Sequence, residues 1–227
     1  MFIFHILRNL YIQYRYRSEI QELKEIINDY KYEGNDELVI EANKVYYDRR
    51  DKNKWAFAMQ FWKNHPDVQI LRDFPEITGN ILDFGSGSGN LDILSWLKIT
   101  GIDLSPLWVM LANKNKEMYK NENVSFFSWN IITDTYNIPY KCDSVWSTQT
   151  FEHIPDPSQI FDALRKYAKP NAPMLITVPY QHAYEDEGHV HHFMTAKELD
   201  THLSKYVDVK KVVLYPKFRI LAALVHL

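Results

Sequence analysis

Hydrophobic and polar residues follow a helical pattern in the first part of the chain. Apolar side chains recur at helical spacing over residues 1 to about 32 and again over about 37 to 64, which predicts two helical regions. His65-Pro66 then interrupts the second region, because the residue before a proline disfavours helical backbone. The amino-terminal part of the chain is therefore predicted to be helical.

From Thr78 onward, short apolar runs alternate with amphipathic segments, which predicts alternating strands and helices. Such alternation is typical of a parallel sheet that is covered by helices on both faces. The chain therefore divides into a helical N-terminal extension over residues 1–70 and an α/β domain over residues 71–227. The expected strands cover residues 80–83, 99–103, 124–129, 144–148, 174–178, 206–214 and 218–226. The expected helices cover residues 89–97, 106–119, 157–168 and 195–203.

The last two expected strands are separated only by Tyr215-Pro216-Lys217. A connection this short cannot carry a crossover between parallel strands, so these strands should form an antiparallel hairpin. Pro106 and Pro157 begin two of the expected helices, where a first helical turn tolerates proline. The predicted fold class is α/β, with a Rossmann-like doubly wound sheet whose last strand is antiparallel.

A glycine-rich turn follows the first expected strand and carries the most informative chemistry. The strand ends in Asp83, and Gly85, Gly87 and Gly89 follow at alternate positions. Glycine allows a ligand to approach the backbone closely and accepts positive φ. A carboxylate before the turn would repel a pyrophosphate but attract a cationic group. Asp103 ends the second strand, where an acid can accept hydrogen bonds from ribose hydroxyls. The pattern indicates a nucleoside cofactor with a cationic part.

The composition narrows the classes of function. Of the 227 residues, 26 are Lys or Arg and 29 are Asp or Glu, which gives a formal net charge of −3. Nucleic acid is therefore not an expected partner. Cys142 is the only cysteine, so an internal disulfide is excluded and a reducing, cytoplasmic location is expected. No apolar run in the sequence reaches the length of a membrane span.

The basic residues Arg8, Arg15 and Arg17 lie among aromatic residues in the first helical region. One interpretation is an interfacial helix that touches a membrane. The interpretation that we favour is an amphipathic helix packed on its own domain or on a second subunit, as in a homodimer.

Five segments in the expected order resemble a known family. They are ILDFGSGSGN, GIDLS, CDSVWSTQTFEHIPDP, LRKYAKPNAPMLITVP and HHFMTAKELDTHL. Together they resemble the class I S-adenosylmethionine-dependent methyltransferases of the small-molecule type, similar to methyltransferase type 11, over residues 78–214. The resemblance implies a seven-stranded sheet with an antiparallel last strand and S-adenosyl-L-methionine as cofactor.

The resemblance also assigns residues to the cofactor. Asp83 would face its amino-acid part, Asp103 its ribose, and Leu104 its adenine. Asn130 stands where the family usually has an acid, and its carbonyl oxygen can accept a hydrogen bond from the adenine amino group. The full expected cofactor-binding set is Asp83, Gly85, Ser86, Gly87, Gly89, Asp103, Leu104, Asn130, Ile131, Thr148 and Gln149.

Histidines gather in the acceptor region. His153 follows the fourth expected strand, and His182, His189, His191 and His192 follow the fifth. Histidine is the natural base near neutral pH, so the candidate catalytic residues are His153, His189 and His192. A structural hydrogen bond is the favoured interpretation of His153. A divalent metal or a polar acceptor loop are alternatives for the cluster. No metal is assigned, because the spacing matches no defined ligand motif.

The predicted function is methyl transfer to a small-molecule acceptor, with an oxygen of a saccharide or of another biosynthetic intermediate as the expected target. An NAD-dependent oxidoreductase is one alternative, since it would use a similar glycine turn. A non-catalytic binding protein on a methyltransferase fold is the other.

Overall fold

A computed structural model describes residues 66–95, 97–135, 140–183 and 188–227. The helical regions predicted before residue 66 lie outside these ranges. Within the described ranges, no helix is long and apolar enough to cross a membrane.

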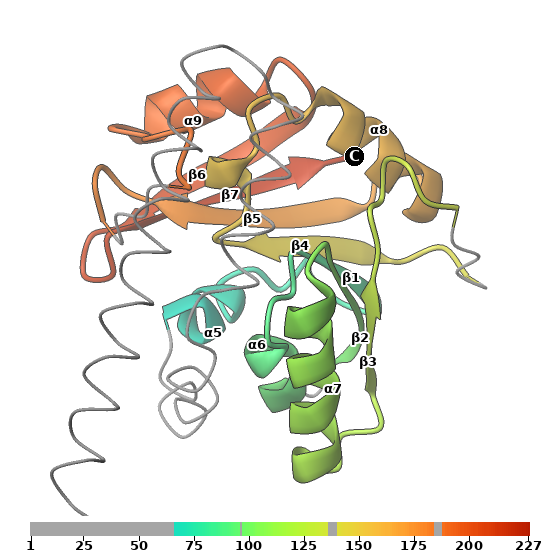
Figure 1. Ribbon diagram of the computed structural model, residues 1–227. Helices are drawn as coiled ribbons and strands as arrows, with labels where there is room; N and C mark the ends of the chain where they lie inside the picture. Colours follow the sequence, from blue (N-terminus) through green and yellow to red (C-terminus); the bar gives the residue numbers. More distant parts are fainter. Residues whose placement is uncertain (1–65, 96, 136–139, 184–187) are drawn as a thin grey trace, which may run out of the picture.

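A seven-stranded sheet forms the centre of the molecule, in the order β3-β2-β1-β4-β5-β7-β6 (Figure 1). β7 runs antiparallel to both of its neighbours, and the other pairings are parallel. The predicted fold class and the predicted terminal hairpin are therefore confirmed. The strands are β1 Asn80–Phe84, β2 Lys98–Asp103, β3 Val124–Ser128, β4 Ser144–Thr148, β5 Pro173–Pro179, β6 Asp208–Tyr215 and β7 Ile220–His226.

The helices agree with the sequence pattern except at two places. Helix α5 begins at Pro66, where a first helical turn tolerates proline; no helix was predicted over these residues, and the helical region predicted before Pro66 lies outside the described residues. Helix α6 ends at Leu94 rather than at residue 97, since Ser95 adopts extended backbone. The described helices are α5 Pro66–Leu71, α6 Asn90–Leu94, α7 Pro106–Tyr119, the 3₁₀ helix η1 Phe151–His153, α8 Ser158–Tyr167 and α9 Ala196–Leu203.

Helices cover both faces of the sheet, with α8 and α9 on one side and α5, α6 and α7 on the other (Figure 1). Each face has its own apolar core. Leu82 of β1 packs in the core that contains residues of α8 and α9. Its neighbour Ile81 packs in the core that contains residues of α5, α6 and α7. Successive side chains of a strand point to opposite faces, so Asp83 lies on the same face as Ile81. This alternation puts Asp83 beneath α6.

Candidate functional site

The glycine turn between β1 and α6 is held against the end of β2. The N–H groups of Gly85 and Ser86 both donate to the carbonyl oxygen of Ile102, at 2.9 and 3.0 Å. A Cβ on Gly85 would lie 2.3 Å from Thr150 Oγ1, so this glycine is required by packing. A Cβ on Gly87 would meet none of the described residues within 4 Å. Gly87 is therefore the position of the turn beside which a ligand has room.

Asp103 joins the turn to the start of α7. Its Oδ2 accepts a hydrogen bond from the N–H of Gly87 at 2.9 Å, and its Oδ1 accepts one from the N–H of Ser105 at 2.8 Å. A carboxylate oxygen can accept more than one hydrogen bond. Asp103 is half-buried, as is Leu104 beside it. Asp103 is therefore held in place by the backbone and can still accept a hydroxyl donor.

Beneath the glycine turn lie three buried carboxyl groups, Asp67, Asp83 and Asp92, which we call the buried acidic cluster. Asp83 is 2% exposed and Asp92 is 0% exposed. Burial raises the pKa of Asp83 to about 7, although the neighbouring Trp146 and Asp92 side chains oppose the rise. Burial and the charge of Asp83 hold the pKa of Asp92 well above its usual value. Asp83 and Asp92 therefore keep protons at pH values where exposed carboxyl groups have lost them.

At the ends of β4 and β5, Gln149 and Thr177 connect the strands to α5. Gln149 adopts positive φ at 52°, and its N–H donates to the carbonyl oxygen of Thr177 at 2.9 Å. The hydroxyl of Thr177 donates to Asp67 Oδ1 at 2.7 Å. Thr148 lies beside these residues and lines a cavity together with Asp67 and Trp146. The predicted pair Thr148 and Gln149 is therefore at the same sheet edge as the glycine turn.

Asn130 and Ile131 follow β3 and have different environments. The side-chain oxygen of Asn130 accepts a hydrogen bond from the N–H of Ile132 at 3.0 Å, and the N–H of Asn130 donates to Asp134 Oδ2 at 2.9 Å. Ile131 is 4% exposed and belongs to the apolar core. Their predicted contacts with the adenine stay predictions.

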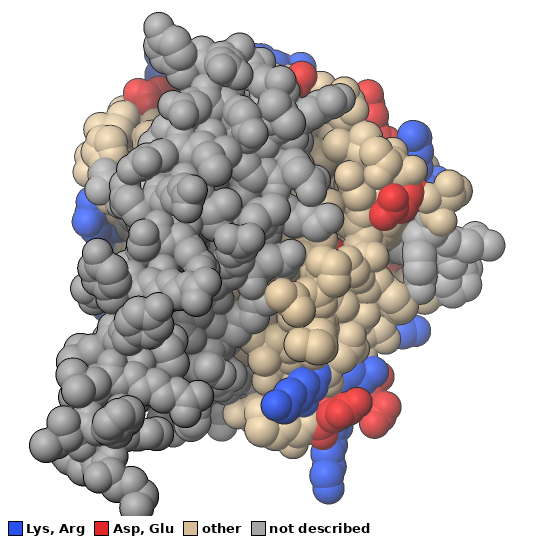
Figure 2. Space-filling view, in the orientation of Figure 1, with Lys and Arg blue, Asp and Glu red and all other residues tan. Residues whose placement is uncertain are grey.

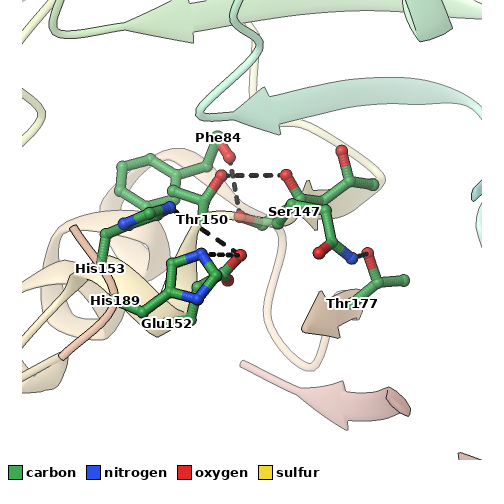
Figure 3. Close-up of polar contacts among 9 residues, drawn as sticks. Phe84, Ser147, Thr150, Glu152, His153, Thr177 and His189 are labelled. Atoms are coloured by element: carbon green, nitrogen blue, oxygen red, sulfur yellow. Dashed lines mark hydrogen bonds and ion pairs between the residues drawn. The ribbon is translucent and has the colours of Figure 1, made fainter. Parts of the chain in front are cut away.

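A second cluster joins the segment after β4 to the segment after β5. Glu152 Oε1 lies 3.9 Å from the Nε2 atom of His153 and 3.9 Å from the Nε2 atom of His189 (Figure 3). The centroids of the two imidazole rings are 4.7 Å apart. The N–H of Val190 donates to the carbonyl oxygen of Glu152 at 2.7 Å, which holds the two segments together. We call these three residues the Glu152–His153–His189 cluster.

The other loop histidines differ in their surroundings. The Nε2 atom of His191 lies 2.9 Å from the carbonyl oxygen of Ile154, so His191 ties the loop to the end of η1. His192 and His182 are exposed, with ring centroids 5.0 Å apart. The ring centroid of His192 is 6.0 Å from that of His189. The three predicted catalytic histidines therefore lie in one region, on the rim formed by the two loops.

Reasoning from sequence did not single out Asp67, Asp92 or Glu152. Glu152 had a usable signal, because it directly precedes His153 in the FEHIPDP stretch. Asp92 and Asp67 had none, because an acid in a short helical segment is usually solvated.

The sheet order, the glycine turn and the acid at the end of β2 define a Rossmann-like protein with a site for a nucleoside-containing ligand. The profile of a family described as "Methyltransferase domain" matches residues 12–208. The chain belongs to that methyltransferase family.

One curated relative is the release factor glutamine methyltransferase of Fusobacterium nucleatum. It is 31% identical over 110 residues, which make up 46% of this chain and 30% of that protein. The matched part is therefore less than a third of that relative's length.

Similar solved structures confirm the fold. A SAM-dependent methyltransferase of Aquifex aeolicus has a TM-score of 0.59 at 20% identity, covering 71% of this chain and 89% of that one. DhpI in complex with SAH has a TM-score of 0.60 at 20% identity, covering 82% of this chain and 96% of that one. The glycopeptide N-methyltransferase MtfA in complex with SAM has a TM-score of 0.56 at 10% identity, covering 70% and 92%.

Proposed function

We propose that this protein is an S-adenosylmethionine-dependent methyltransferase that acts on a small-molecule acceptor. The observation that carries the proposal is the contact between the glycine turn and Asp103. The Asp103 carboxylate accepts a hydrogen bond from the N–H of Gly87. Family membership supports a methyltransferase. Complexes of DhpI with SAH and of MtfA with SAM support the choice of cofactor.

The residues present suit this cofactor. No described residue fills the space beside Gly87, which leaves room for it, and Asp103 can accept hydrogen bonds from the ribose hydroxyls. Asp83 Oδ1 is buried without a hydrogen-bond partner among the described residues, and a cationic group favours the ionised form of such a carboxyl group. S-adenosylmethionine supplies an electrophilic methyl group on a positively charged sulfur, together with an ammonium group.

The side of the site that binds the methyl acceptor is formed by the three histidines on the loop rim, His153, His189 and His192. Oxygen is the proposed target atom, in a saccharide or another biosynthetic intermediate. A hydroxyl acceptor must lose a proton, and the proposed bases are His153, His189 and His192. On the described part of the face shown in Figure 2, Lys and Arg side chains lie interspersed with Asp and Glu. This mixture gives no support to a polyanionic acceptor such as nucleic acid.

The division at residue 70, a homodimer and a cytoplasmic location stay predictions.

Calorimetric titration tests the cofactor. We expect S-adenosylhomocysteine to bind and NAD not to bind. Asp103→Asn should weaken S-adenosylhomocysteine binding about 10- to 100-fold, because hydrogen bonds to a charged group contribute about 1.5–3 kcal/mol. Asp208→Asn is the matched control, since Asp208 is an exposed carboxylate on β6, outside the site. Binding of NAD alone would refute the proposal.

The acceptor is tested separately. The enzyme is incubated with a methyl-deuterated cofactor and hydroxyl- or amino-bearing metabolites, and products are followed by mass spectrometry. We expect a methyl label on an oxygen atom. Label found only on nitrogen or carbon would overturn the choice of oxygen and leave the methyltransferase proposal in place.

A further inference from the structure

The Glu152–His153–His189 cluster has the composition of a metal site. Two imidazole nitrogens and one carboxylate oxygen lie within 4.8 Å of one another. The side chains of Glu152, His189 and His153 are 1%, 5% and 15% exposed, respectively. Figure 3 shows both rings directed at the same carboxylate group. A ligand held by all three residues would therefore be enclosed on the protein side and reachable past His153.

The distances suit a transition-metal ion. Metal–nitrogen and metal–oxygen bonds of about 2.0–2.2 Å put neighbouring ligand atoms of a tetrahedral ion roughly 3.4 Å apart. Glu152 Oε1 is 3.9 Å from each histidine Nε2. Small side-chain rotations would close this difference. A divalent ion there would also supply positive charge beside the deeply buried carboxylate of Glu152.

We propose that Glu152, His153 and His189 bind a first-row divalent transition-metal ion. Imidazole nitrogen selects ions such as Zn²⁺, Fe²⁺ or Co²⁺ over Mg²⁺, which prefers oxygen ligands. Three protein ligands leave at least one coordination position open. The sequence led us to assign no metal, because the loop spacing matches no ligand motif; only the fold brings Glu152 to His189.

The open position takes the acceptor oxygen, and this part of the inference rests on the proposed function. The cluster is close to the cofactor turn, because Thr150, two residues before Glu152, packs against Gly85. A metal ion lowers the pKa of a hydroxyl group that it binds. An acceptor hydroxyl bound there would release its proton with the O–H electron pair left on the oxygen, and a ring nitrogen of His192 would take the proton. In this arrangement His153 and His189 would be ligands, and His192 would be the base.

The metal site is tested by binding, without any acceptor. The full chain is stripped with a chelator and titrated with Zn²⁺ and with Co²⁺ by calorimetry, and Co²⁺ is also followed by its visible absorption. We expect one ion per chain. Glu152→Gln and His153→Gln should each weaken binding more than about 100-fold, since even the loss of an outer-shell partner costs about 10- to 100-fold.

His182→Gln is the matched control, because His182 belongs to the same loop but not to the cluster. It should bind metal as the unaltered chain does. The more exposed position of His153 makes its variant the safer one for folding, which circular dichroism verifies. Absence of stoichiometric binding for both ions would overturn the proposal, as would unchanged binding in both cluster variants. Titration with S-adenosylhomocysteine on the same samples keeps the two proposals apart: a chain that binds it but no metal refutes only the metal site.

Discussion

The buried carboxyl groups of Asp83 and Asp92 should make the stability of this protein decrease as the pH rises, and Asp92→Asn tests this expectation. Asp83 and Asp92 are almost completely buried, and burial raises the pKa of both carboxyl groups. In the unfolded chain both groups have a pKa near 3.8. Over the intervening pH range the folded protein therefore holds protons that the unfolded chain has released.

The sign of the effect follows from this proton difference. Stabilisation by the raised pKa of Asp83 is complete below about pH 4 and is lost as the pH rises through about 7. Each retained proton lowers the free energy of unfolding by about 1.4 kcal/mol per pH unit. Between 3.8 and about 7, Asp83 alone therefore accounts for a loss of about 4 kcal/mol.

Asp92→Asn removes one of these protons without changing the size of the side chain. The introduced amide can donate a hydrogen bond to Asp83, so the variant should fold. Relative to the unaltered protein, its free energy of unfolding should increase by about 1.4 kcal/mol for each pH unit over which Asp92 keeps its proton. Urea unfolding between pH 5 and 8, followed by circular dichroism without cofactor, measures the difference.

Asp208→Asn serves as the control, because Asp208 is exposed on β6, away from the buried carboxyl groups. His202 titrates in the opposite direction, since burial lowers its pKa to about 4, but it contributes equally to both proteins. Parallel stability curves for Asp92→Asn and the unaltered protein would show that Asp92 holds no proton in the folded state. The reasoning about the cluster would then be refuted.

Two further predictions concern the glycine turn and Asp83. With its pKa at about 7, Asp83 should lose its proton when the cationic cofactor binds, so affinity for S-adenosylmethionine should increase from about pH 6 to 8. Calorimetry in two buffers of different ionisation enthalpy detects the released proton, and proton release that persists in Asp83→Asn would contradict the assignment. Gly89→Ala would put a Cβ 2.3 Å from Phe126 Cζ at a φ of +66°, and should lower the free energy of unfolding by about 2–4 kcal/mol. Gly87→Ala, where a Cβ meets none of the described residues, should lower the free energy of unfolding by only about 1 kcal/mol and yet weaken cofactor binding. Equal losses of unfolding free energy for the two variants in urea would argue against the packing explanation.

The hydrophobic pattern predicted the sheet well because most of the strands are short, apolar and bounded by turns. Helix α7 was predicted with its observed bounds, Pro106–Tyr119. Its start could be found because Pro106 suits a first helical turn. Helix α5 was not predicted, because Pro66 was interpreted only as the end of one helical region and not as the start of another helix. The predicted helical extension over residues 1–70 lies mostly outside the described residues and stays a prediction.

The candidate site could be predicted only in part. The turn and Asp103 are local features of sequence, so both could be found. The pairing of Glu152 with His189 could not, because it depends on two loops that are brought together by β4 and β5. The loop histidines follow no regular period, so nothing in the sequence distinguished the buried His189 from the exposed His192.

The place of β7 between β5 and β6 has a consequence for how the chain folds during synthesis. Strand β6 is made before β7, yet β7 is its hydrogen-bonded neighbour in the sheet. Until residues 220–226 have left the ribosome, β6 has no edge on which to dock, and β5 keeps one edge open. An open strand edge is a template for pairing with other chains. Nascent chains that stall before β7 should therefore aggregate more readily than chains that contain it, and chaperones should bind preferentially to this late intermediate.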